Sequence, residues 1–171
     1  SILLDLLTPV AKTFPAERGF EANALAIQIL GGYGYTSEYL PESYMRDQKL
    51  NTLHEGTSGI QSMDLLGRKV AMENGAAMST LARLVKDCIA AAGAHPALAK
   101  HAADLANAVD LLDNTTKTLQ AAGARGEVRL FLANSHVYME MFGHVLIAWQ
   151  WLRQANAAAT VTRNAPSFTV Q

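Results

Sequence analysis

The order of apolar and polar residues predicts helices along most of the 171-residue chain. In the first thirty residues, apolar side chains recur three or four positions apart, at Phe20, Ala24, Ile27 and Leu30. Thr8-Pro9 predicts a helix start, because proline at the first helical position loses no hydrogen bond. Pro15 predicts a kink or a restart. Gly31-Gly32 predicts the end of this helix, since glycine accepts the left-handed backbone of a C-cap.

The middle of the chain predicts short elements and irregular segments. These are a loop over residues 33–40, a short helix from Pro41 to about Asp47 and an irregular passage over residues 50–56. Thr57 or Ser58 is placed to cap the next helix, because a hydroxyl oxygen there accepts from a free backbone N–H. That helix is predicted to run through Gly67 and to end at Asn74-Gly75.

The second half predicts three long helices, each with an apolar stripe. The stripes are Met78, Leu81, Val85, Cys88 and Ala92; then Leu98, Ala102, Leu105, Val109, Leu112, Thr116 and Leu119; then Phe131, Ser135, Tyr138, Phe142, Val145, Trp149 and Leu152. Gly93 separates the first predicted helix from the second, and the segment Gly123–Gly126 separates the second from the third. Two helices that carry long apolar stripes (seams) and are joined by a short turn are typical of an antiparallel bundle. The polar tail from Ala157 is expected to fray. No segment has a strand pattern, so the predicted fold class is all-α.

Composition narrows the function classes. The formal net charge of −1 gives no electrostatic attraction to nucleic acid or to an anionic membrane. The single cysteine, Cys88, excludes an intramolecular disulfide and fits a reducing compartment such as the cytoplasm. No apolar run approaches the roughly 18 residues of a membrane-spanning helix. Because the chain opens on Ser1 and residues 2–7 already have a mid-helix pattern, we expect the C-terminal part of a longer protein.

The segment His54-Glu55-Gly56-Thr57-Ser58-Gly59 carries the best candidate chemistry. Glu55 stands just before a predicted helix N-terminus, in a stretch without helical periodicity. It is a candidate general base, or an acidic residue that interacts favourably with the helix dipole; spacing alone favours the dipole. The small residues 56–59 would suit a phosphate or pyrophosphate, or would form an ordinary cap.

Other motifs argue against several sites. Gly31–Gly34 follows a helix rather than a strand, so it lacks the context of a dinucleotide fingerprint. His54-Glu55 is not the start of a zinc motif, because position 58 is serine. No metal site is predicted. The remaining histidines, at 95, 101, 136 and 144, are interpreted as helix-surface or packing residues. Arg46-Asp47 is interpreted as an ion pair and the aromatic stripe from Phe131 to Trp149 as core or interface rather than a cofactor site.

A set of motifs over residues 9–70 resembles the C-terminal domain of flavin-dependent acyl-CoA dehydrogenases. The motifs are Gln28-x-x-Gly31-Gly32, Gly34-Tyr35, Arg46-Asp47, Glu55-Gly56-Thr57 and Ile60-Gln61, together with Pro9-Val10-Ala11-Lys12 and Leu65-Leu66-Gly67-Arg68-Lys69. The resemblance implies that residues 1–73 are part of that helical domain, with the catalytic loop. Residues 74–171 would form the C-terminal extension of the larger bacterial members. An N-terminal helical domain and a middle β-domain are expected elsewhere in the full protein.

The resemblance also implies a reaction. Family members oxidise an acyl-CoA thioester to the trans-2-enoyl-CoA: a glutamate removes the α-proton, and the β-hydride passes to FAD. Glu55 aligns with that glutamate, which replaces the dipole interpretation. Gly56 would lie against the substrate, and Thr57, Ser58 and Gly59 near the flavin nucleotide. The isolated chain is expected to be inactive.

The same resemblance implies partners. Gln28, Gly31 and Gly32 match a segment that reaches the FAD of a neighbouring subunit, which implies a homo-oligomer, dimer or tetramer. Electron-transfer flavoprotein is the expected electron acceptor. A flavin acyl-CoA oxidase and a non-catalytic helical dimerisation module, suggested by the two long seams, stay as alternatives.

Two positions depart from the family pattern. Position 59 often carries Glu or Gln, whereas Gly59 offers only its backbone. The residue before the base is often a tyrosine on the acyl pocket, and here it is His54. His54 could tune Glu55, recognise a polar acyl group or simply pack.

Overall fold

A computed structural model describes residues 1–164, and side chains as far as Val161. The elements are α1 (Ile2–Leu30), α2 (Gly32–Tyr35), α3 (Pro41–Asn51), α4 (Ser58–Gly67), the 3₁₀ turn η1 (Lys69–Ala71), α5 (Met72–Gly93), α6 (Ala99–Ala124), α7 (Val128–Leu132) and α8 (Ser135–Asn164). No strand occurs in this described part of the chain, which confirms the all-α prediction. No described helix is long and apolar enough to cross a membrane.

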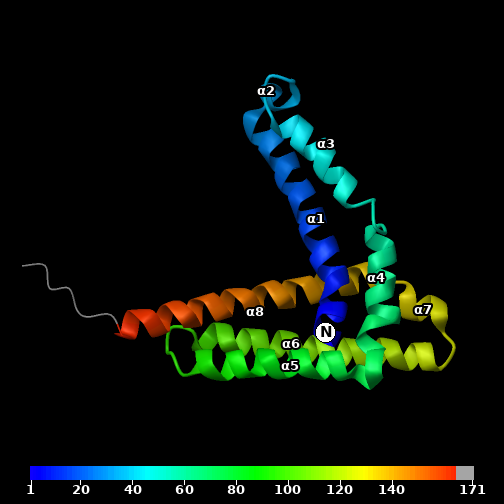
Figure 1. The fold of residues 1–171 in the computed structure, drawn as a ribbon, viewed down its shortest axis with the longest axis vertical. Helices are drawn as coiled ribbons and strands as arrows, with labels where there is room; N and C mark the ends of the chain where they lie inside the picture. Colours follow the sequence, from blue (N-terminus) through cyan, green and yellow to red (C-terminus); the bar gives the residue numbers. More distant parts are fainter. Residues whose placement is uncertain (165–171) are drawn as a thin grey trace, which may run out of the picture.

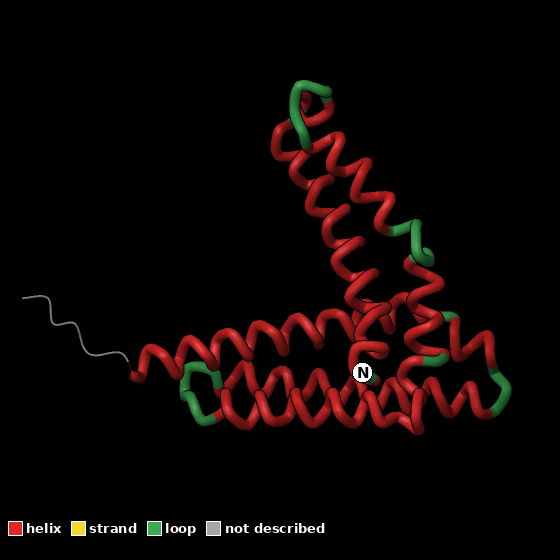
Figure 2. Tube along the Cα trace, in the orientation of Figure 1, coloured by secondary structure: helices red, strands yellow, loops and turns green. Residues whose placement is uncertain are grey.

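The helices form a base and an arm (Figure 1). The base consists of α5, α6 and α8, in which α6 runs antiparallel to the other two. The arm is the second half of α1 with α2 at the tip and α3 returning beside α1. Helix α4 continues from α3 back to the base, where it packs against α1 and α8. Only short turns join the helices (Figure 2), so the bend between α3 and α4 is held between two rigid elements.

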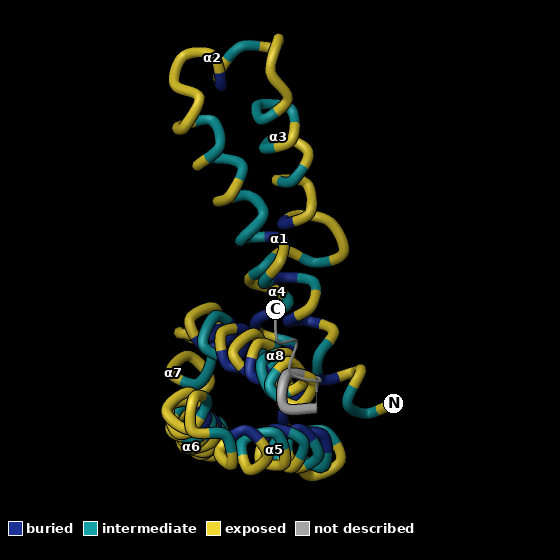
Figure 3. The backbone as a smooth tube through the Cα atoms, turned by 90° about the vertical axis from the view of Figure 1, so that its left-hand side faces the viewer, coloured by how far each residue is buried: buried dark blue, intermediate teal, exposed yellow. Residues whose placement is uncertain are grey.

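The hydrophobic core lies in the base and at the junction with the arm. Most of its buried members come from five helices, and Val70 comes from the turn η1. The helical members include Leu6, Val10, Leu65, Leu66, Ala77, Leu81, Val85, Leu105, Leu112, Tyr138, Met139, Phe142, Val145, Trp149 and Leu152. The predicted stripes of the three long helices supply most of them, and the aromatic side chains Tyr138, Phe142 and Trp149 are core as predicted. Figure 3 shows the contrast with the arm, whose residues are mostly exposed or half-buried.

The first helix runs without a break, so the predicted helix start at Thr8-Pro9 and the predicted restart at Pro15 are wrong. Each internal proline removes one backbone hydrogen bond and costs about 3 kcal/mol in an isolated helix. Here Pro9 is buried between Leu6 and Val10, and Thr8 Oγ1 donates to the Leu4 carbonyl at 2.8 Å. Packing of α1 against α4, α5 and α8 therefore outweighs the local preference. Gly31 ends the helix with φ 59°, as predicted.

The middle elements differ from the prediction at their edges. The expected loop over residues 33–40 begins with the single helical turn α2. Helix α3 starts at Pro41 as predicted but continues to Asn51 rather than Asp47. Arg46 pairs with Glu42, one helical turn back, and not with Asp47, because adjacent residues do not face each other on a helix.

Helix α4 ends at Gly67, before the predicted Asn74-Gly75. Arg68 leaves the helical region with φ −131°, and the turn η1 follows. The left-handed residues Glu73, Asn74 and Gly75 then turn the chain into α5. Asn74-Gly75 therefore lies where the chain changes direction, but at the start of α5 rather than at the predicted end of α4.

The third long helix also has different ends. Phe131 belongs to the separate helix α7. Its ring lies against Gly123 of α6, where an added Cβ on Gly123 would lie 3.1 Å from the ring. Helix α8 begins at Ser135 and continues to Asn164, so fraying from Ala157 is wrong over that range. Residues 165–171 of the expected tail lie outside the described residues.

Two contacts fix the arm to the base. Arg18 of α1 donates to Glu140 of α8 at 2.7 Å. The Phe14 ring lies over Gly143 and meets His144 edge-on, with 5.2 Å between ring centroids. Since both contacts involve α8, the direction of α1 is set by the base rather than by α3 alone.

Candidate functional site

The candidate segment, residues 52–59, is the bend that connects α3 to α4. Thr52 is buried at its start, and its hydroxyl donates to the Lys49 carbonyl at 2.9 Å. The backbone N–H groups of Leu53 and His54 still donate to Leu50, which extends the last turn of α3. The bend therefore leaves α3 from an ordered end.

Glu55 and Gly56 make the bend itself, with φ 55° and φ 90°. Glycine takes such angles freely, but a left-handed residue with a Cβ costs roughly 1–2 kcal/mol. Two side chains hold the carbonyl groups of these residues. Gln61 donates Nε2 to the Glu55 oxygen at 2.7 Å, and Lys12 of α1 donates Nζ to the Gly56 oxygen at 2.6 Å. The strained conformation is thus stabilised by surrounding structure.

Thr57 caps α4, as the sequence predicted. Its backbone is extended (φ −60°, ψ 162°), and its Oγ1 accepts from the Ile60 N–H at 3.4 Å. Ser58 donates its hydroxyl to the Glu17 carboxylate of α1. Ser62 donates to the Ser58 carbonyl at 2.6 Å. The exit from the bend is therefore tied both to α4 and to α1.

The reactive groups of the bend are unengaged by the described residues. His54 and Glu55 are exposed. No described side chain forms a hydrogen bond or ion pair with the Glu55 carboxylate, and the Glu55 N–H has no described acceptor. A carboxylate and an N–H of one residue, both free on a fixed backbone, can take a proton and polarise an oxygen. Enclosure from water is not supplied by the described part of this chain.

The start of α4 also has free donors. Ser58 and Gly59 are its first two residues, and their N–H groups have no partner within the helix. A Cβ at Gly59 would meet nothing within 4 Å, so this surface is open to a ligand. Free N–H groups at a helix N-terminus fit the phosphate of a nucleotide cofactor.

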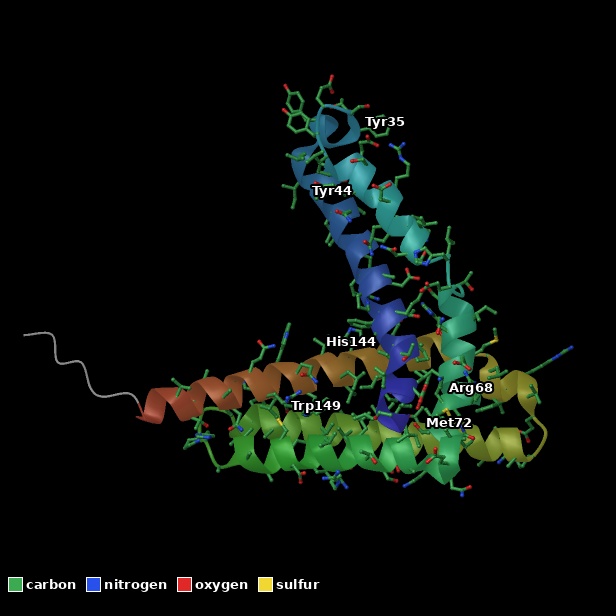
Figure 4. All side chains as sticks on the ribbon, viewed as in Figure 1. Tyr35, Tyr44, Arg68, Met72, His144 and Trp149 are labelled. Carbon is green, nitrogen blue, oxygen red and sulfur yellow. The ribbon has the colours of Figure 1, made fainter. Side chains whose placement is uncertain are left out.

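The second predicted cofactor segment lies at the far end of α1. Gln28, Gly31 and Gly32 are exposed at the tip of the arm. Gln28 follows Lys12 by sixteen positions on helix α1, and this spacing corresponds to about 24 Å along the helix axis. Figure 4 shows Tyr35 at the tip and Tyr44 on α3, both far from the base. The structure therefore brings residues 54–59 together and keeps Gln28, Gly31 and Gly32 apart from them.

The remaining candidates do not form a site with Glu55. No group of three potential metal ligands occurs among the described residues. His144 Nδ1 lies 2.7 Å from the Glu140 carbonyl, a packing role as expected. An apolar groove of about 550 Å³ separates α6 from α8 and is lined by residues such as Leu105, Val145 and Trp151. Residues 52–59 do not line it, so it belongs to the base and not to the bend.

Sequence reasoning gave no role to three residues that hold the bend. Lys12 and Gln61 stand within the motifs of the resemblance, but only as points of agreement. Glu17 had no role at all. Both α1 residues lie more than 40 positions from their partners in the bend, so no spacing rule connects them.

The chain was also compared with known proteins. Residues 5–71 match the family model described as acyl-CoA dehydrogenase, C-terminal domain. Residues 81–168, more than half of the chain, match the model described as acetyl-CoA dehydrogenase C-terminal like. The chain belongs to the acyl-CoA dehydrogenase family. This is a family of oxidoreductase enzymes, and the resemblance found in residues 9–70 is confirmed.

Individual relatives of this chain are larger proteins. A broad-specificity linear acyl-CoA dehydrogenase of Mycobacterium tuberculosis is 28% identical over 159 residues, which are 90% of this chain and 26% of that protein. A butyryl-CoA dehydrogenase of Syntrophomonas wolfei is 46% identical over 67 residues, 39% of this chain and 11% of its own. A 3-methylmercaptopropionyl-CoA dehydrogenase of Ruegeria pomeroyi is 36% identical over 83 residues, which are 48% of this chain and 14% of that protein. The chain thus spans about a quarter or less of these relatives.

Proposed function

We propose that the intact protein dehydrogenates an acyl-CoA thioester between Cα and Cβ, with Glu55 of this chain as the base that takes the α-proton. One observation carries the proposal. Glu55 stands in a fixed left-handed conformation at the start of α4, with its backbone carbonyl bonded and its carboxylate and N–H unengaged by the described residues.

The chemistry requires both free groups. An α-proton beside a thioester is weakly acidic, so its removal needs a positioned base and stabilisation of the charge that develops on the thioester oxygen. The Glu55 N–H is available as a donor to that oxygen, and Gly56, by the family resemblance, would lie against the substrate. The free N–H groups of Ser58 and Gly59, together with Thr57, would hold part of the flavin nucleotide. Bound FAD would supply the hydride acceptor.

The rest of the site would come from outside the described residues. Exposed Glu55 requires enclosure by other segments of the intact protein or by a partner subunit, because proton transfer from a carbon acid is favoured away from water. Gln28, Gly31 and Gly32 would reach the FAD of a neighbouring subunit in a homo-oligomer. The roughly 24 Å of helix α1 between Gln28 and Lys12, the residue that contacts the bend, supports this. Large exposed side chains on the arm, such as Ile29, Tyr35 and Leu40, support a covered arm.

Further parts of the proposal stay predictions. They are electron transfer to electron-transfer flavoprotein, a cytoplasmic location and a functional division of the chain near residue 73. An oxidase would use the same base and differ in passing electrons to oxygen. A non-catalytic dimerisation module is favoured only by the exposed apolar side chains of the arm. An oligomeric enzyme would need such a surface as well.

The test is an anaerobic titration of the full-length protein with saturated acyl-CoA thioesters of different chain lengths. Loss of the oxidised flavin absorbance with at least one thioester is expected. Glu55→Gln, which keeps the size of the side chain and removes the base, should retain FAD and slow this reduction by about 10²–10⁴-fold. Reduction of the Glu55→Gln flavin at the wild-type rate would refute the assignment. Formation of hydrogen peroxide in step with substrate, under air, would indicate the oxidase.

A further inference from the structure

The bend between α3 and α4 holds its backbone and leaves its carboxylate free. The Glu55 carbonyl is bonded by Gln61, the Gly56 carbonyl by Lys12 and the Ser58 hydroxyl by Glu17. The Glu55 carboxylate itself has no hydrogen-bond or ion-pair partner among the described side chains. Such an arrangement fixes where the carboxylate stands without using any of its acceptor capacity.

Lys12 is the most specific of these contacts. It comes from α1, which packs against α3 and also against α4, α5 and α8 of the molecule's base and junction. Its half-buried side chain brings Nζ to 2.6 Å from the Gly56 oxygen. The described residues give Lys12 no carboxylate partner, so its ammonium group is directed to a backbone carbonyl. Hydrogen bonds from charged donors are the stronger class, and this one joins the bend to the rigid part of the molecule.

The bond acts on the peptide that follows Glu55 and Gly56. Gly56 has φ 90°, and a glycine in such a position has a wide choice of other conformations. Without a donor on its carbonyl, the Gly56–Thr57 peptide is free to rotate, and Glu55 is released from φ 55° to less strained angles. The second change swings the Glu55 side chain, because its Cβ moves with its own backbone angles.

We propose that Lys12 is a positioning residue for Glu55: its ammonium group, bonded to the Gly56 carbonyl, holds the bend in the conformation that points the Glu55 carboxylate at the substrate. This inference rests on the proposed function of Glu55 as the base. Lys12 takes no proton in the reaction and does not touch the substrate. A displacement of about 1 Å of a catalytic group can slow a reaction about 10²-fold, which sets the scale of the expected effect.

The experiment compares four variants of the full-length protein with the wild type. Lys12→Met keeps the length and apolar stem of the side chain and removes its donor. Lys12→Arg restores a charged donor. Lys100→Met is the matched control, since Lys100 lies exposed on α6 and pairs with Asp104. Glu55→Gln reports on the base itself. Four quantities are measured for each: FAD content, thermal midpoint, rate of anaerobic flavin reduction at saturating acyl-CoA, and deuterium uptake of the peptides covering residues 52–61.

The expected result separates positioning from stability. Lys12→Met retains FAD and its thermal midpoint and slows flavin reduction about 10–100-fold. The hydrogen-bonded amides that flank the bend, those of His54, Ile60 and Gln61, exchange at least about 10-fold faster. Lys12→Arg recovers most of the rate and the protection, and Lys100→Met matches the wild type throughout. A wild-type rate in Lys12→Met, or a slower rate with unchanged exchange in the bend, overturns the inference.

Failure of the proposed function gives a different pattern. If no thioester reduces the flavin, or if Glu55→Gln reduces it at the wild-type rate, Glu55 is not the base, while the exchange measurement still tests whether Lys12 holds the bend. Should Lys12→Met not accumulate as folded protein, Gln61→Met removes the donor to the Glu55 carbonyl instead. This variant is expected to slow reduction about 3–10-fold with faster exchange in the bend; wild-type values for both overturn the inference.

Discussion

Gly143 offers a sharp test of how the arm is fixed to the base. It is buried on α8 beneath the Phe14 ring of α1, and a Cβ at this position would lie 2.3 Å from Phe14 Cδ2. Carbon atoms in contact are about 3.5–4.0 Å apart, so the ring would have to retreat by roughly 1.2 Å. His144 meets the ring edge-on at 5.2 Å between centroids, and the Arg18 guanidinium carbon lies 5.5 Å from its centroid. The ring therefore has little room, and Gly143→Ala is expected to overpack the junction.

The magnitude follows from two opposing terms. Overpacking of this kind costs about 1–3 kcal/mol. Replacing glycine by alanine in a helix interior contributes up to about 1 kcal/mol in the opposite direction. Gly93→Ala is the matched control, because a Cβ at Gly93, at the end of α5, would meet nothing within 4 Å. Gly143→Ala should thus have a free energy of unfolding about 1–3 kcal/mol lower than that of Gly93→Ala.

The assay is guanidinium unfolding of the 171-residue chain followed by circular dichroism. Equal free energies of unfolding for the two alanine variants would refute the close approach of Phe14 to Gly143. A second variant locates the strain. Phe14→Leu in the Gly143→Ala background should recover part of the loss, because the smaller side chain relieves the clash, and the two changes should therefore be non-additive.

Two further predictions concern buried and strained groups. Tyr138 shares a hydrogen bond of 2.6 Å with Thr116, and burial raises the pKa of Tyr138 to about 12. Tyr138→Phe should cost about 0.5–1.5 kcal/mol at neutral pH. Since the unfolded phenol ionises near pH 10, the wild type should also lose stability between about pH 10 and 12, and the variant should lack this part of the loss, as urea unfolding at each pH would reveal. Glu55→Gly relieves a left-handed residue with a Cβ, so thermal unfolding should show it about 0.5–1 kcal/mol more stable while the full-length protein loses activity. An unchanged or lower stability would mean that the backbone at Glu55 is not strained.

The site could be predicted from the sequence only in part. The cap at Thr57 follows from a local rule, because a hydroxyl oxygen needs only the N–H groups three residues on. Glu55 was found through the resemblance to a family, whereas its spacing alone favoured a helix-dipole role. Its left-handed backbone and its exposure in this chain were not predictable. Both depend on how α3, α1 and α4 meet.

The sequence by itself determined the fold class and most of the long helices, because the periodicity of apolar residues and the position of glycines act over a few residues. It determined the end of α1 at Gly31 and the start of α4 after Thr57 for the same reason. Only the tertiary structure decided that α1 continues through Pro9 and Pro15, since burial against other helices outweighs two lost hydrogen bonds. The tertiary structure alone also brought Lys12 and Glu17 to the bend, more than 40 residues away in the chain. Local patterns choose the elements, whereas packing among distant elements sets the position of each functional group.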